Sequence, residues 1–265
     1  MGRFTQPRVA EMVADVLRDR IVNGELKDGR LLPKQEDLLE EFDVSLPSLR
    51  EAMRILETEG LVSVRRGNVG GAVVHRPTSE AAAFILGLVL QSERVVLSDL
   101  ATALRVVEPA CAAVCAGSSS RRRIAGRLRA LITESEQRLE EGPEFTRSSR
   151  EFHDELARLC ENRTLRELLG TLDMLWSHYE ARWADETARR GVYPDLKMRR
   201  RDVSDHQAIA QAIHSGDTEG AEQASRRHLE QVHRYLLGRT GDKPLAFTEL
   251  RMGFGSSQLR RPARR

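Results

Sequence analysis

Three of the seven histidines occupy positions that could support chemistry. His153, His206 and His228 each fall on the apolar side of a different predicted helix, among hydrophobic residues at three- and four-residue spacing. A buried imidazole needs partners for its ring nitrogens. One such histidine is more often a satisfied core residue than a ligand, but three on successive inward faces favour a shared site. Imidazole suits zinc, nickel, manganese and iron as a ligand.

Arg105 is a second candidate for ligand binding. It precedes Glu108 by three residues on a predicted helix whose other positions are mostly apolar. A guanidinium in that setting could hold a carboxylate through two parallel hydrogen bonds. Equally, it could pair with Glu108 or with a second subunit. The aromatic residues of a later helix, Trp176, Tyr179 and Trp183, fit core or dimer packing better than ligand stacking.

The elements that must position these residues are mostly helices. Apolar residues recur at helical spacing through nearly the whole chain, and two-residue alternation is convincing only around residues 61–74. We therefore expect a mostly α protein, with a first unit over residues 1–76, a helical bundle over 77–239 and a disordered basic tail over 240–265. The bundle helices are expected near residues 80–91, 97–116, 121–141, 143–161, 165–188, 194–214 and 217–237.

Composition excludes several classes of protein. The 265 residues include 42 Lys and Arg against 40 Asp and Glu, which gives a net charge of only +2 and no global field for nucleic acid. The longest apolar run, residues 81–90, is about half the length of a membrane-spanning helix. Cys111, Cys115 and Cys160 lack the spacing of a disulfide scaffold or a CxxC zinc site. We expect a cytoplasmic protein with no membrane segment.

The first unit has the pattern of three helices and a wing. A helix over residues 7–24 is followed by a second after Pro33 and by a third that Ser45 would cap and that runs to about Glu59. On the third helix Leu49 belongs to an apolar face, whereas Pro47, Arg50 and Arg54 share the neighbouring face. This arrangement predicts a helix-turn-helix with a basic recognition helix that fits the major groove of DNA.

Two strand-like stretches, residues 61–64 and 72–75, are joined by a glycine-rich loop that holds Arg65, Arg66 and Asn68. A hairpin of this kind could approach phosphates or the minor groove. The first unit is not basic as a whole, because it holds 12 Lys and Arg against 13 Asp and Glu. From Arg50 to Arg76, however, five arginines face three acids, so positive charge lies where DNA contact is expected.

The segment LLPKQEDLLEEFDVSLPSLREAMRILETEGLVSVRRGNVGGAVV resembles the winged helix-turn-helix of GntR-family transcription regulators. The helical remainder, with DLATALRVVEPACAAVCA, REFHDELARLCENRTLREL and DHQAIAQAIHSGDTEGAEQASRRHL, is similar to the FCD-type effector-binding domain of the FadR-like branch. The resemblance implies a homodimer, in most cases a repressor, that binds a palindromic double-stranded DNA operator and responds to a small molecule.

Two departures from the family concern DNA contact. Glu36 and Leu46 stand where the family usually has arginines, whereas Arg50 matches a family arginine and Ser48 a family hydroxyl. Lys34 or Gln35 could compensate near the second helix, so the operator should differ from the commonest family consensus. The expected DNA-binding residues are Lys34, Gln35, Ser45, Pro47, Ser48, Arg50, Arg54, Arg65, Arg66 and Asn68.

A third departure concerns the metal. The resemblance implies that His153, His206 and His228 coordinate a divalent metal (Zn, Ni, Mn or Fe) together with a carboxylate four residues before the first histidine, where this chain has Ser149. Three outcomes stay open: a three-histidine site completed by water or effector, a weaker site, or a pocket without metal that binds an anion.

The resemblance also implies that Arg105 faces the effector. The expected effector is an organic acid or a fatty acyl compound. Its predicted binding residues are Arg105, Ser149, His153, His206 and His228.

A metal-dependent hydrolase that uses the three histidines is the main alternative function. Catalysis would need a general base near the metal, and the sequence has no motif such as HExxH to supply one. It would also leave the wing unexplained. A regulator that binds acyl chains without metal is a further possibility. The sequence favours a ligand-responsive transcription regulator that is not an enzyme.

Overall fold

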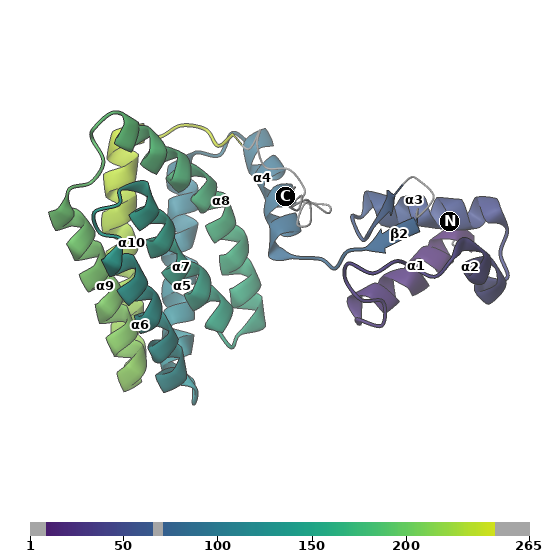
Figure 1. Ribbon diagram of the computed structural model, residues 1–265, viewed down its shortest axis with the longest axis horizontal. Helices are drawn as coiled ribbons and strands as arrows, with labels where there is room; N and C mark the ends of the chain where they lie inside the picture. Colours follow the sequence, from purple (N-terminus) through teal and green to yellow (C-terminus); the bar gives the residue numbers. More distant parts are fainter. Residues whose placement is uncertain (1–8, 66–70, 247–265) are drawn as a thin grey trace, which may run out of the picture. The chain divides into compact units, whose positions relative to one another are not determined.

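The computed structural model describes residues 9–65 and 71–246. They form two compact units, one holding the described residues up to Ala81 and the other those from Ala82 onward (Figure 1). Helices dominate both units, and the described residues contain a single two-stranded sheet. The predicted mostly α class is confirmed.

The first unit contains the predicted helices and wing in the predicted order. Its helices are α1 (Val9–Val22), α2 (Gln35–Phe42) and α3 (Leu46–Thr58). Strands β1 (Val62–Arg65) and β2 (Gly71–Val74) pair in antiparallel fashion, with Val62 opposite Val74. Helices α1 and α3 pack against each other around a core of buried aliphatic residues, among them Leu17, Ile21, Leu38, Leu49, Leu56, Val62 and Val74.

The start of α3 follows from its local sequence. The Ser45 hydroxyl accepts a hydrogen bond from the Ser48 amide at 3.4 Å, and Pro47 lies in the first turn, where no intrahelical N–H bond is lost. Along the helix Leu49 is buried, while Arg50 and Arg54 are exposed. The predicted division of α3 into a packed face and a basic face is therefore confirmed.

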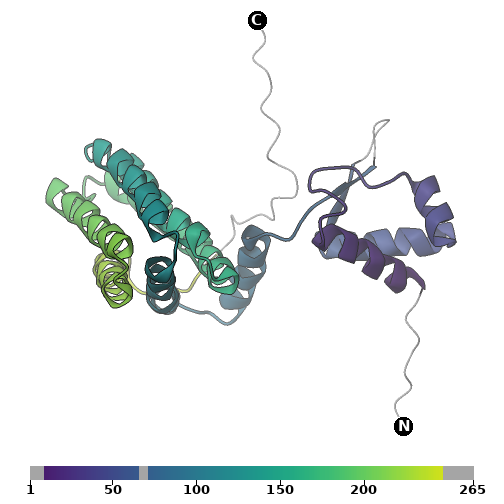
Figure 2. The same ribbon diagram turned by 90° about the horizontal axis from the view of Figure 1, so that it is seen from below.

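The second unit is a helical bundle around α5. Figures 1 and 2 show α5 to α10 lying side by side, and α5 packs against α7, α8, α9 and α10. The helices are α4 (Ser79–Ser92), α5 (Leu97–Gly117), α6 (Arg121–Gln137), α7 (Pro143–Leu159), α8 (Arg163–Arg189), α9 (Leu196–Ser215) and α10 (Thr218–Thr240).

Helix α5 is the one described helix that is long and apolar enough to cross a membrane, judged by length and composition. Of the 18 consecutive residues over which this helix is most apolar, 50% are buried inside the bundle. Leu104 and Cys111 are fully covered by the neighbouring helices. Its apolar character is accounted for by its central position in the core.

The ends of the helical unit show two details. At the start of α4 the Thr78 hydroxyl accepts a hydrogen bond from the Ala81 amide at 3.3 Å. The predicted disordered tail is ordered over its first residues. The Leu245 amide donates to the Val95 carbonyl at 2.8 Å, and the Leu245 side chain is buried in the bundle core. Residues 247–265 lie outside the described residues.

Replacing Leu245 by alanine should lower the free energy of unfolding by about 2 kcal/mol or more, because it removes a buried side chain from the core. Urea unfolding followed by circular dichroism measures the change. Leu168→Ala is the matched control, since Leu168 is 50% exposed and its truncation should cost less than about 0.5 kcal/mol. Equal effects of the two substitutions would contradict the packing of residues 242–246.

Candidate functional site

The predicted DNA-contacting residues lie on the surface of the first unit. Lys34 and Gln35 are exposed at the start of α2, and Ser45, Pro47, Arg50 and Arg54 are exposed along α3. Ser48 is half-buried, and Arg65 is exposed at the end of β1. Arg66 and Asn68 fall outside the described residues.

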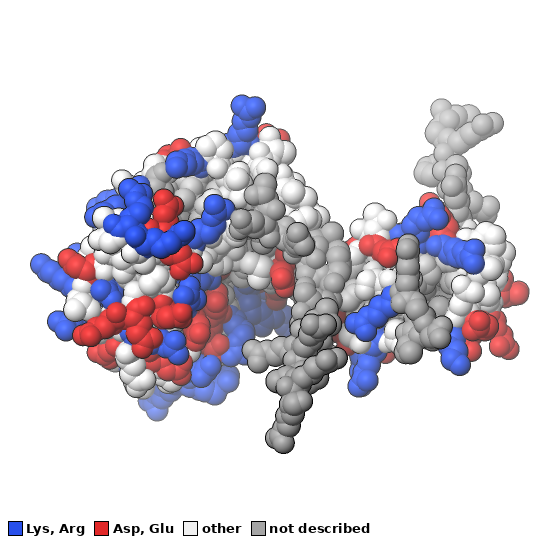
Figure 3. Space-filling model, turned by 45° about the horizontal axis from the view of Figure 1, so that its top comes forward, with Lys and Arg blue, Asp and Glu red and all other residues white. Residues whose placement is uncertain are grey.

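Two arginines of α1 pair with acidic residues elsewhere in the first unit. The Arg18 guanidinium donates to both Glu59 oxygens, at 2.6 and 2.8 Å, and so ties α1 to the end of α3. Arg20 pairs with Glu41 at 2.5 Å, which ties α1 to α2. Glu59 and Glu41 are therefore paired with arginines of α1 and not with those of α3. In Figure 3 basic and acidic side chains form separate small groups on this unit rather than one basic face.

Arg54 has an exposed partner in Glu51, at 3.4 Å. Within the described residues Arg50 has no ion pair. An exposed pair of this kind contributes little and exchanges readily for a phosphate. Both arginines can therefore reach an anionic partner.

Helix packing in the second unit brings the three predicted histidines together. The Nε2 atoms of His153 and His206 are 3.1 Å apart, those of His206 and His228 3.1 Å, and those of His228 and His153 3.3 Å. His206 and His228 are fully buried, and the His153 side chain is 17% exposed. The Phe152 ring stacks on His206 with centroids 4.0 Å apart, which fixes the orientation of that imidazole.

Glu108, on α5, determines which nitrogen of His153 faces the cluster. Its Oε2 is 2.9 Å from His153 Nδ1, and its Oε1 accepts from the Ser225 hydroxyl at 3.0 Å. Because an ionised carboxylate only accepts hydrogen bonds, Nδ1 carries the proton and a neutral His153 presents a lone pair at Nε2. Glu108 is buried, and no described arginine or lysine pairs with it. Its counter-charge has to come from the histidine cluster or from a cation bound there.

The environment shifts the pKa values of these groups in different directions. Burial lowers the pKa of His153, but the charge and hydrogen bond of Glu108 outweigh burial and raise that pKa to about 9. Burial and the neighbouring imidazoles hold the pKa of His206 well below its usual value. Burial alone would raise the pKa of Glu108, yet His153 lowers it overall. Groups with such divergent pKa values are typical of ligand and metal sites.

The donor atoms fit a divalent metal ion. Zinc–nitrogen bonds of about 2.0–2.1 Å in a tetrahedral site place the nitrogens about 3.3 Å apart, close to the observed separations. The Nε2 atoms are the three donor atoms of the described residues that come within 4.8 Å of one another in this way. The buried carboxylate behind His153 matches the second layer that orients histidine ligands.

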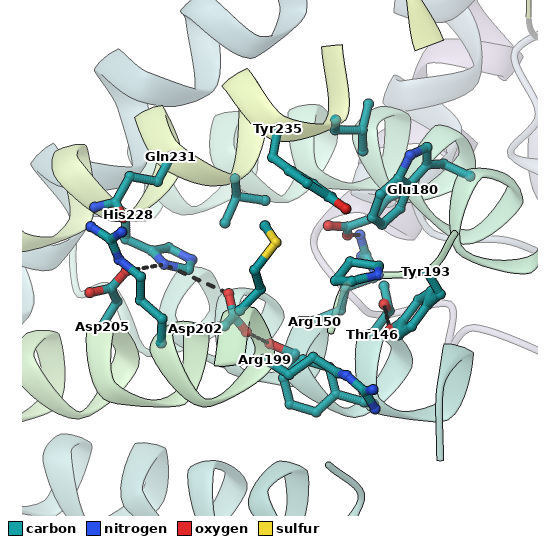
Figure 4. Close-up of a pocket in the computed structure, with 18 of the residues that line it drawn as sticks. Thr146, Arg150, Glu180, Tyr193, Arg199, Asp202, Asp205, His228, Gln231 and Tyr235 are labelled. Carbon is teal, nitrogen blue, oxygen red and sulfur yellow. Dashed lines mark hydrogen bonds and ion pairs between the residues drawn. The ribbon is translucent and has the colours of Figure 1, made fainter. Parts of the chain in front are cut away.

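The cluster opens into a cavity of about 370 Å³ between α7, α8, α9 and α10 (Figure 4). Ser149, His153 and His228 lie along part of its wall, and Trp183, Tyr193 and Tyr235 supply aromatic surface. The volume falls within the range that small-molecule sites occupy. His206 lies outside the cavity wall and reaches the site through its Nε2 contacts.

The cavity also contains a mostly buried ion pair. Arg150 Nη1 lies 3.4 Å from Glu180 Oε2, and the two side chains are 16% and 14% exposed. Burial raises the pKa of Glu180 despite the opposing charge of Arg150. This long contact leaves the guanidinium with capacity for another acceptor.

Arg105 is not placed in this cavity. Its guanidinium donates to the Thr102 hydroxyl at 2.7 Å, and it is not among the residues that line the cavity wall. The alternative of an Arg105–Glu108 pair is wrong, since Glu108 contacts His153 and Ser225 instead. Trp176 and Trp183 are buried as the packing interpretation predicted, and Trp183 also lines the cavity.

Two acidic residues at the site were not predicted from the sequence. Glu108 shares the buried stripe of α5 with Leu104 and Cys111, and an acid on an apolar stripe is a signal that was available. Asp202 accepts a hydrogen bond from the Ser149 hydroxyl at 2.5 Å and precedes His206 by four residues. That spacing was equally visible in the sequence.

Comparison with known proteins identifies the class. The family model of bacterial regulatory proteins of the gntR family matches residues 9–73, and the FCD domain model matches residues 99–231. The chain belongs to the GntR family of bacterial transcription regulators, with an FCD effector domain. Members of this family bind DNA and are not enzymes, so the hydrolase alternative is excluded.

Individual relatives agree with this class. The chain is 28% identical over 234 residues to the Uxu operon regulator of Haemophilus influenzae, covering 85% of this chain and 80% of that protein. It is 27% identical over 240 residues to the transcriptional repressor NanR of Cronobacter sakazakii, covering 88% and 87%. A solved GntR structure from Streptococcus agalactiae shares the fold, with a TM-score of 0.65, 24% identity, and coverage of 85% of this chain and 99% of that one.

Substituting glutamine for Glu108 should weaken Zn²⁺ binding by about 10- to 100-fold, because the amide no longer compensates the cation or fixes the His153 tautomer. Competition with a chelating dye measures the affinity. Ser225→Ala, which removes only the second hydrogen bond to Glu108, should cost less than tenfold. If Glu108→Gln bound zinc as tightly as the wild type, the carboxylate would have no role in orienting the ligand.

Proposed function

We propose that this protein is a ligand-responsive repressor that binds a palindromic operator as a homodimer, and that a small organic acid in the cavity of the helical unit changes its affinity for DNA. The observation that carries the proposal is the pairing of an arginine-bearing α3 surface with a separate unit whose histidine cluster opens into a ligand-sized cavity. Action on DNA implies a location in the bacterial cytoplasm.

The predicted DNA-binding set is proposed as the DNA interface. Arg50 and Arg54 would enter the major groove from α3, with Ser45, Pro47 and Ser48 near the backbone at its start. Lys34, Gln35, Arg65, Arg66 and Asn68 would contact flanking phosphates or the minor groove. The small number of free cations makes affinity depend on the combination of two half-sites.

A dimer is supported by the surface of the helical unit. Helix α4 exposes three large apolar side chains, Ile85, Leu88 and Val89, within a single turn. Exposed apolar residues that cluster in this way favour burial against a partner. We propose that a second copy covers this face.

The lining of the cavity favours a hydroxylated carboxylate over a fatty acyl chain as the effector. Arg150 can donate hydrogen bonds to a carboxylate, and Thr146, Tyr193 and Gln231 can exchange hydrogen bonds with hydroxyl groups. An acyl chain would leave Arg150, Glu180 and Asp202 buried against methylene groups, which is costly. The effector would sit beside the metal proposed for His153, His206 and His228.

Changing Arg50 to alanine should weaken operator binding by at least tenfold, because two symmetric contacts are lost from the dimer. A gel-shift titration against the DNA upstream of the protein's own gene measures this, and wild-type affinity should fall steeply with salt. Arg66→Ala should also weaken binding. Arg190→Ala, in the helical unit, is the control and should leave affinity unchanged. Undiminished binding by both Arg50→Ala and Arg66→Ala would reject the proposed interface.

Changing Arg150 to alanine should abolish the stabilisation that a matching hydroxy acid confers, since the carboxylate loses its cationic partner. Thermal-shift screening of sugar acids, fatty acids and acyl thioesters identifies the ligand through its mass-action effect on stability. Arg147→Ala is the control, because Arg147 lies three residues earlier on α7 and pairs with exposed Glu144. Stabilisation by acyl compounds alone would overturn the assignment of effector class.

A further inference from the structure

Ser149 and Asp202 form a polar pair beside the histidine cluster. The Ser149 hydroxyl donates to Asp202 Oδ2 at 2.5 Å, across 53 residues of sequence. Both residues line the cavity together with His153 and His228. Asp202 and His228 are labelled in Figure 4. The pair joins α7 to α9 at the end of the cavity where the imidazoles lie.

Asp202 has the same relation to His206 that Ser149 has to His153. Each precedes its histidine by four residues on one helix, and residues four apart lie on the same helical face. A carboxylate or histidine at that spacing can share a metal ion with the histidine that follows it, as the two histidines of HExxH do. Helix α9 therefore carries a carboxylate on the face from which His206 enters the cluster.

The charge of Asp202 is not used elsewhere among the described residues. Its Oδ1 lies 3.8 Å from the Nδ1 of His228, and no described arginine or lysine pairs with it. The His228 Nδ1 atom is buried without a hydrogen-bond partner. A mostly buried carboxylate that faces histidines and lacks a basic partner is suited to balancing a bound cation.

We propose that Asp202 supplies the carboxylate ligand of the metal ion held by His153, His206 and His228, with Ser149 as a positioning residue that holds this carboxylate through its hydroxyl. The inference rests on the metal site of the proposed function and completes its donor set. Three imidazoles and one carboxylate suit zinc, and also manganese or iron. Helix α9 thus supplies the carboxylate, and the Ser149 hydroxyl on α7 serves as its hydrogen-bond donor.

The test is the Zn²⁺ affinity of the full-length protein after metal removal, measured by competition with a chelating dye. Asp202→Asn should weaken binding at least tenfold, because the amide lacks the charge. Asp205→Asn is the matched control. Asp205 Oδ2 lies 3.7 Å from the same His228 nitrogen, so it carries the same charge at nearly the same distance from His228, and its loss should change affinity less than threefold.

The exchange variant Ser149→Asp with Asp202→Ser provides the second arm. It places the carboxylate on α7 instead of α9 and should keep the Zn²⁺ affinity within threefold of wild type. Cobalt substitution adds a spectroscopic readout, since loss of a carboxylate ligand alters the visible absorption of bound Co²⁺. Circular dichroism of each variant shows that it is folded.

Each outcome separates this inference from the site on which it rests. Wild-type affinity in Asp202→Asn would overturn the role of Asp202 while leaving the three-histidine site intact. Equal losses in Asp202→Asn and Asp205→Asn would assign the effect to general negative charge and would overturn the ligand role. A folded exchange variant that binds no better than Asp202→Asn would do the same. Absence of zinc binding by the wild type would remove the metal site itself, with the DNA-binding proposal still tested by gel shift.

Discussion

The buried contact between Glu108 and His153 is the constraint around which the helical unit is organised. A carboxylate that is 1% exposed and has no basic partner among the described residues needs positive charge nearby. His153 meets that need from one side, and its second nitrogen then faces His206 and His228. Because α5 carries Glu108 and the other three residues come from α7, α9 and α10, these four helices must keep their relative positions to satisfy one charge. A cation in the cluster would satisfy it more fully.

The proposed metal site and the proposed effector cavity adjoin each other in the helical unit. His153 and His228 belong both to the histidine cluster and to the cavity wall, and Asp202 lines the same cavity. A ligand that enters the cavity therefore meets the groups that would hold the metal. Trp183 and Tyr235 supply aromatic surface on another part of the cavity wall. The cavity can therefore select a ligand by both its shape and its charge.

The DNA-binding unit shows how charge can be placed without being abundant. Arg18, Arg20 and their acidic partners tie α1 to α2 and to the end of α3, whereas Arg50 is exposed and has no ion pair among the described residues. The near-neutral composition of the whole chain hides this division. Under the proposed function, specificity would depend on a few positioned arginines and on the symmetry of a dimer more than on bulk attraction.

The sequence by itself determined the class of fold and named candidate residues for the site. Helical periodicity, the Ser45 cap and the alternation around the wing are local properties, because each depends on residues within a few positions of one another. The same periodicity placed three histidines on inward faces. It could not show that Ser149 donates a hydrogen bond to Asp202, or that Glu108 pairs with His153 and not with Arg105. Nor could it show that residues 242–246 pack on the bundle. Those contacts join residues many positions apart, and they depend on how helices rotate and approach one another, which only the tertiary structure decides.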